Sequence, residues 1–164
     1  MRCLDQGGGI VKEERRTPDG SHLAPRSMFS RRLEDRLTHW SSRTGIAVEV
    51  WALPSQPLPG EVADLVQAVI VDTLDHVERH VPTARSLSVA LTVAPSGLRL
   101  TLGVEHAATA GTRLDAVLLR RRVMVAELGG SLAVNTVDPP AFLPGEPLGG
   151  TTVGAWLPAE ALRR

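Results

Sequence analysis

The sequence has little cysteine: Cys3 is the only one among 164 residues. One thiol cannot form a disulfide within the chain, nor can it build a cysteine-based metal site. Apolar runs are also short, well below the roughly 20 residues that a membrane-spanning helix needs. Residues 1–30 lack the apolar stretch of a secretory signal. We therefore expect a cytoplasmic protein that does not insert into a membrane.

The chain has no excess of charge of either sign, since 18 Lys and Arg residues balance 18 Asp and Glu residues. The local basic clusters, Arg120–Arg122 and Arg163–Arg164, are short. Without a net positive field the chain has no electrostatic means of attracting nucleic acid or an anionic membrane. We expect neither as a partner.

The length predicts one domain, or one domain with a tail. Residues 1–30 contain Gly7–Gly9 and a charged run over 12–16, with too little apolar surface to offset the entropy of ordering. We expect this segment to be a disordered tail, with ordered structure beginning near Met28 and a single domain over residues 31–160.

Hydrophobic periodicity over that domain predicts alternating helices and strands. Loops are indicated at 53–60, 105–113 and 138–150, each rich in proline, glycine or small polar residues. The expected helices are 29–40, 61–80 and 114–128, and the expected strands are 46–51, 86–94, 98–104, 132–136 and 152–157. This order predicts a two-layer α+β sandwich in which helices cover one face of a mixed, mostly antiparallel sheet.

Four segments in this order resemble the ATP-binding domain of sensor histidine kinases, the GHKL superfamily, in its nitrate-sensor-type branch. Residues 65–80 resemble the N-box helix, and the strand pair ending near Val104 resembles the adenine-binding region. Residues 125–132, Val-Ala-Glu-Leu-Gly-Gly-Ser-Leu, resemble the junction between helix and strand. Residues 149–153, Gly-Gly-Thr-Thr-Val, with the Leu-Pro at 157–158, resemble the closing strand. The resemblance spans residues 33–158 and implies the histidine-kinase-like ATPase, or Bergerat, fold.

The N-box of this family carries a Glu, a Mg²⁺-binding Asn and often a His at four-residue spacing. Asp72, His76 and His80 stand at these positions, and the spacing places them on one helix face. Mg²⁺ prefers oxygen ligands, so an imidazole is a poor replacement for the amide. The three residues are open to other interpretations: polar groups at a helix edge, or a transition-metal pair of histidines. We predict no metal site.

The resemblance also implies an adenine-binding Asp and a glycine-rich lid, and neither is present. In the gapless register Val104 stands at the Asp position; a shift of one or two residues brings Glu105 or His106 there but restores no glycine. The chain also has no glycine between Gly111 and Gly129, where the family's lid segment cradles phosphate. Branched side chains obstruct that kind of backbone contact. Arg120–Arg122, which lie in this stretch, are interpreted as a solvated helix face. We also find no dimerisation helices with a phospho-acceptor His, so we expect no autophosphorylation and assign no catalytic residues.

These observations predict a degenerate ATP-binding domain that acts as a regulatory, protein-binding module in signal transduction, as in two-component systems, with lost or weak ATP binding. The vestigial nucleotide cleft would comprise Asp72, His76, His80, Gly150 and Thr151. We expect no cofactor and an unidentified protein partner; a homodimer is compatible with the sequence. The alternative is a divergent nucleotide-binding kinase subunit or an anti-sigma-type kinase, which would use ATP and Mg²⁺.

Overall fold

The structure is a computed structural model that describes residues 27–107, 113–137 and 148–163. The predicted tail of residues 1–30 lies outside the described residues as far as position 26. The first described element is helix α1 (Met28–Thr44). The side chain of Ser27 accepts a hydrogen bond from the Ser30 N–H at the start of this helix, which provides an N-cap. Gly45, with φ of 75°, ends it.

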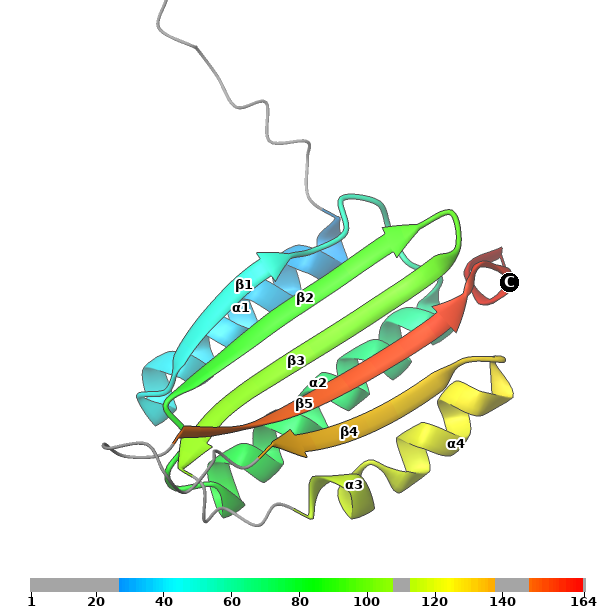
Figure 1. The fold of residues 1–164 in the computed structure, drawn as a ribbon. Helices are drawn as coiled ribbons and strands as arrows, with labels where there is room; N and C mark the ends of the chain where they lie inside the picture. The colour runs from blue at the N-terminus through cyan, green and yellow to red at the C-terminus, as the bar shows by residue number, and fades with distance from the viewer. Residues whose placement is uncertain (1–26, 108–112, 138–147, 164) are drawn as a thin grey trace, which may run out of the picture.

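Five strands form one sheet in the spatial order β1-β2-β3-β5-β4. They are β1 (Ala47–Ala52), β2 (Ser86–Ala94), β3 (Gly97–Ala107), β4 (Ser131–Val137) and β5 (Leu148–Pro158). Only β1 and β2 pair in parallel, and the other three pairs are antiparallel. The predicted mixed, mostly antiparallel sheet is confirmed (Figure 1).

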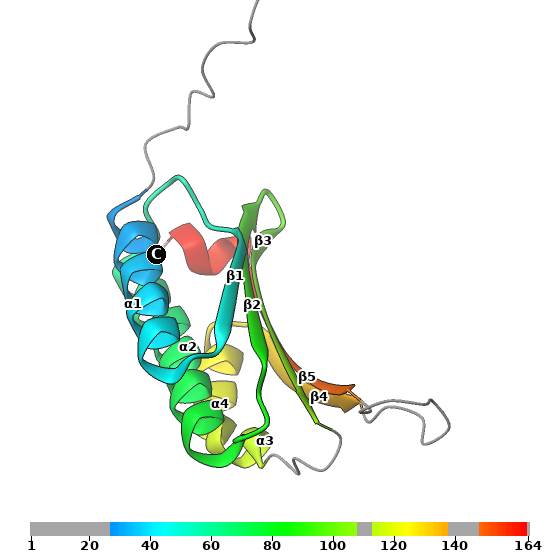
Figure 2. The same ribbon diagram turned by 90° about the vertical axis from the view of Figure 1, so that its left-hand side faces the viewer.

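Helices α1, α2 (Gly60–His80) and α4 (Leu119–Glu127) lie on one side of the sheet (Figure 2). The core lies between the two layers, because alternate strand residues point toward the helices. Leu65, Val69 and Val77 of α2 are 4%, 1% and 1% exposed, as the apolar stripe of that helix predicts. The α+β sandwich expected from the sequence is therefore confirmed. No described helix combines the length and the apolar content that crossing a membrane requires.

The predicted helix over 114–128 is in fact two helices, α3 (Leu114–Val117) and α4, separated by a bend at Leu118. The ψ of Leu118 is 3°, whereas a regular helix has about −42°. Hydrogen bonds from Leu118 N–H to Leu114 O and from Arg122 N–H to Leu118 O continue on both sides of the bend. Leu114 and Leu118 are both fully buried, so we attribute the bend to their packing.

Two predicted loops are shorter than expected. Residues 105–107 of the predicted 105–113 loop extend β3, and residues 148–150 of the predicted 138–150 loop begin β5. The physical reason is mutual pairing, since Glu105 lies opposite Gly150 and His106 opposite Gly149. Residues 108–112 and 138–147 lie outside the described residues.

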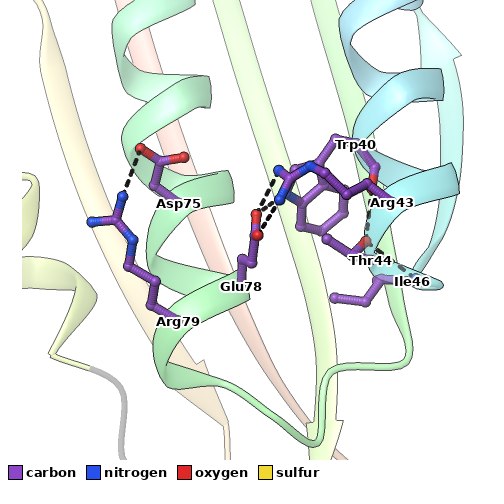
Figure 3. A network of polar contacts seen from close by, with 7 residues as sticks. All are labelled: Trp40, Arg43, Thr44, Ile46, Asp75, Glu78 and Arg79. Atoms are coloured by element: carbon purple, nitrogen blue, oxygen red, sulfur yellow. Dashed lines mark hydrogen bonds and ion pairs between the residues drawn. The ribbon is translucent and has the colours of Figure 1, made fainter.

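A polar network ties the C-terminal half of α1 to that of α2 (Figure 3). The Glu78 carboxylate accepts hydrogen bonds from both terminal nitrogens of Arg43 and, at 3.2 Å, from Trp40 Nε1. The hydrogen bond from Arg43 lowers the pKa of Glu78. Trp40 is 4% exposed, so it also packs in the core. The two helices are thereby fixed in register where α2 carries His76 and His80.

Candidate functional site

Asp72 of α2 forms an ion pair with Arg121 of α4. The Asp72 Oδ2 accepts a hydrogen bond from Arg121 Nε at 2.8 Å. The two side chains are 29% and 23% exposed, so the pair is partly shielded from solvent. It borders a shallow groove of about 350 Å³ that Arg36, Asp64 and Gln67 also line. The negative charge of Asp72 is thus balanced by the guanidinium of Arg121.

His76, one turn further along α2, is buried, with 6% of its surface exposed. Neither ring nitrogen has a hydrogen-bond partner among the described residues. Burial, and next the charge of His80, lower the pKa of His76. The ring centroids of His76 and the exposed His80 are 5.0 Å apart, with the planes tilted by 40°. The environment of the buried imidazole therefore disfavours its protonated form.

The three N-box positions thus differ in environment although they share one helix. Asp72 lines the groove with Arg121, while His76 and His80 pack against each other. That they belong to one vestigial nucleotide cleft stays a prediction. Within that part, no group of three or more His, Cys, Asp and Glu side chains is arranged to hold a metal ion.

Gly150 and Thr151 lie in β5, away from the groove. The Thr151 hydroxyl is 2.9 Å from His106 Nε2 and 3.2 Å from the Thr136 hydroxyl. His106 Nδ1 lies 2.9 Å from the Ala107 carbonyl oxygen, which can only accept, so Nδ1 carries the proton and Nε2 accepts from Thr151. His106 and Thr151 are 0% and 2% exposed. This hydrogen-bonded chain satisfies buried polar groups between β3 and β5.

Gly150 belongs to a different surface from the Asp72 groove. With Ser88, Gly103 and Thr152 it lines a hollow of about 250 Å³ on the face of the sheet that no described helix covers. The structure therefore brings Asp72 together with Arg121, and Thr151 together with His106, both on the helix-covered side of the sheet, whereas Gly150 is on its other face. Neither Arg121 nor the His106–Thr151 contact was predicted from the sequence.

Helical spacing carried a signal for Arg121 that we did not use. Leu118 and Val125 are buried, and Arg121 stands three residues after the first and four before the second. That spacing places it on the inner face of α4, whereas Arg120 and Arg122 are exposed. The interpretation of all three arginines as a solvated face is wrong for Arg121.

Val104 is buried, 3% exposed, and lies in β3 opposite Leu87 and Thr151. The resemblance places the adenine-binding carboxylate of the family at this position. The aliphatic side chain of Val104 is part of the core between sheet and helices. A side chain of this kind cannot accept a hydrogen bond.

Comparison with known proteins identifies the fold. No protein-family model and no curated protein matches the sequence. Solved structures do match: histidine kinase AdeS of Acinetobacter baumannii aligns with a TM-score of 0.52 and 12% identity over 79% of this chain. The histidine kinase domain of the EL346 blue-light-activated histidine kinase of Erythrobacter litoralis aligns with a TM-score of 0.52 and 20% identity over 85%. The chain spans 62% and 65% of those two solved chains. It therefore has the fold of the ATP-binding domain of histidine kinases.

Proposed function

We propose that this chain is a degenerate histidine-kinase-like ATP-binding domain that acts in signal transduction by binding another protein, with ATP binding lost or much weakened. The observation that carries the proposal is the state of the N-box helix. The positions that hold catalytic and Mg²⁺-binding groups in the family are occupied here by an ion-paired carboxylate and a buried imidazole.

The ligand set does not fit Mg·ATP. Mg²⁺ binds oxygen ligands in near-octahedral geometry and rarely takes imidazole. His76 offers only nitrogen, and Asp72 is already paired with Arg121 at 2.8 Å. Moving Asp72 to a metal ion would leave a partly buried guanidinium without its counter-ion.

Adenine recognition lacks its acceptor as well. A buried polar contact that is not made costs about 1–3 kcal/mol, which corresponds to roughly ten- to a hundredfold in affinity. Val104 imposes this loss at the adenine position. The segment that would hold the lid glycines includes helices α3 and α4, and neither contains glycine. Main-chain groups that form helical hydrogen bonds are not free to contact phosphate.

The test is isothermal titration calorimetry and thermal shift with Mg·ATP and Mg·ADP. A histidine kinase ATP-binding domain with intact motifs serves as the positive control. We expect no heat signal and no shift in melting temperature at micromolar nucleotide, and no incorporation of labelled phosphate. Micromolar affinity would refute the proposal and support the alternative of a divergent nucleotide-binding kinase subunit or anti-sigma-type kinase. Arg121 would then be the first residue to examine as a phosphate contact.

A further inference from the structure

The outer face of the sheet, opposite the helices, is covered by no described element (Figure 2). Figure 1 looks directly onto it. Strand alternation gives this face its side chains, and across β2, β3, β5 and β4 they are mostly small. The middle of the face consists of Ser88, Ala90, Thr101, Gly103, Thr152, Gly154, Ala133 and Asn135.

Only two charged residues of these four strands point outward, and they stand at opposite ends of β3. Arg99 lies in one row with Trp156, and Glu105 lies in another row with Gly150. The two rows are six residue steps apart along β3, a distance of about 20 Å. Leu102 is midway between Arg99 and Glu105, and it is buried against the helices.

The same midpoint holds on the neighbouring strand. Val153 is midway between Trp156 and Gly150, and it is the register partner of Leu102. A two-fold axis that runs across the strands at this level would bring each row opposite the other row of a second copy. Arg99 would then face the partner copy's acidic end of β3, and the indole of Trp156 would face the glycine of β5.

We propose that this face, with Arg99, Glu105, Trp156 and Gly150 at its two ends, is the interface of a two-fold symmetric dimer of the chain. A self-complementary patch of this kind is what two-fold symmetry requires. At each end of the interface Arg99 of one copy would pair with Glu105 of the other, so two ion pairs form. The inference is independent of nucleotide binding and goes beyond the proposed function.

Size complementarity supports the same arrangement. A Cβ built on Gly150 would have a single heavy atom within 4 Å, the Val104 oxygen at 3.7 Å, so the outward side of this position is open for an opposing ring. Trp156 is 37% exposed, which is high for an indole on a sheet. Two sheets that pack face to face lie about 10 Å apart with strands within about 30° of each other, so long side chains at the ends can meet above the small central residues.

The available area indicates a weak dimer. Four strands spaced about 4.8 Å apart and a strand length of about 20 Å give roughly 400 Å² for each copy. The sum, roughly 800 Å², is below that of stable complexes and within the range of weak, transient interfaces. We therefore expect a dissociation constant in the micromolar range or weaker.

Sedimentation velocity of the full chain over a wide concentration range tests the proposal. The wild type should dimerise, whereas Arg99→Glu and Glu105→Arg should each raise the dissociation constant at least tenfold, because each places two pairs of like charges in contact. An equimolar mixture of the two variants should dimerise again, since every pair across the interface is then of opposite sign. Arg120→Glu, at an exposed position of α4, is the matched control and should behave as wild type.

Gly154→Lys provides a second, steric test. A Cβ at Gly154 meets nothing within 4 Å in the single chain, so the variant should fold normally by circular dichroism. In the dimer it would lie against the partner sheet, and it should abolish association. A wild type that stays monomeric, a mixture that fails to restore the dimer, or a Gly154→Lys dimer would each overturn the proposal. The face would then be left to another segment of the chain or to a different protein.

Discussion

Replacing His76 by leucine should stabilise the protein, although the substitution removes a residue of the N-box helix. The imidazole is 6% exposed, and neither nitrogen has a hydrogen-bond partner among the described residues. A buried polar group without a partner costs about 1–3 kcal/mol. Leucine is similar in volume and needs no partner. We therefore expect a gain of about 1–2 kcal/mol, which is a rise of roughly 2–8 °C in melting temperature for a chain of this size.

The same variant should be less sensitive to acid. An unfolded histidine takes up a proton as the pH falls through about 6.5, whereas burial lowers the pKa of His76 in the folded chain. The unfolded state then binds more protons, so wild-type stability should fall as the pH is lowered from about 7.5 to 5.5, by at most about 1.4 kcal/mol per pH unit from this group. His76→Leu should lose that component.

Urea denaturation at both pH values measures the two effects. His39→Gln, on an exposed position of α1, is the control and should retain the wild-type pH dependence. If His76→Leu destabilises the chain at neutral pH, or leaves the pH dependence unchanged, the imidazole has a partner and our account of the site is wrong.

Two further predictions concern the groove and the sheet. Arg121→Ala and Asp72→Asn should each lower the free energy of unfolding by about 1 kcal/mol. The double-mutant cycle, measured by urea denaturation, should give a coupling energy of about 0.5–1 kcal/mol. Purely additive effects would contradict the pairing. Gly130→Ala should lower the melting temperature strongly, because its Cβ would collide with a main-chain oxygen of β5, whereas Gly154→Ala should leave it unchanged or slightly raised; equal effects of the two substitutions would contradict the packing of β5 described above.

The fold could be predicted because its signals are local. The apolar stripe of α2, with Leu65, Val69 and Val77, shows that helix directly in the sequence. The hairpin between β2 and β3 is marked by Pro95 and Gly97, and Gly97 has φ of 136°. Element ends were less accurate, because β3 and β5 extend each other by pairing residues far apart in the sequence, such as Glu105 with Gly150, and no local pattern reports such pairing.

The site could be predicted only in part. Spacing placed Asp72, His76 and His80 on one helix, but it could not show that Asp72 pairs with Arg121, which lies 49 residues further along the chain. Trp51 shows a related difficulty. A large apolar residue in a strand is expected to pack in the core, yet Trp51 is 72% exposed, because β1 is an edge strand and Trp51 is on its outer side. Alternation gives the two faces of a strand but does not say whether the second face is covered.

The position of β5 between β3 and β4 has a consequence for the order of folding during synthesis. β5 is the last described strand in the chain, yet both of its neighbours are made before it and pair with it rather than with each other. Until residues 148–158 leave the ribosome, β3 and β4 each have an unpaired edge where β5 will bind. Such edges can pair with strands of other chains. The nascent chain should therefore be prone to aggregation until its last strand is inserted, and slow translation through this region should lower the yield of folded protein.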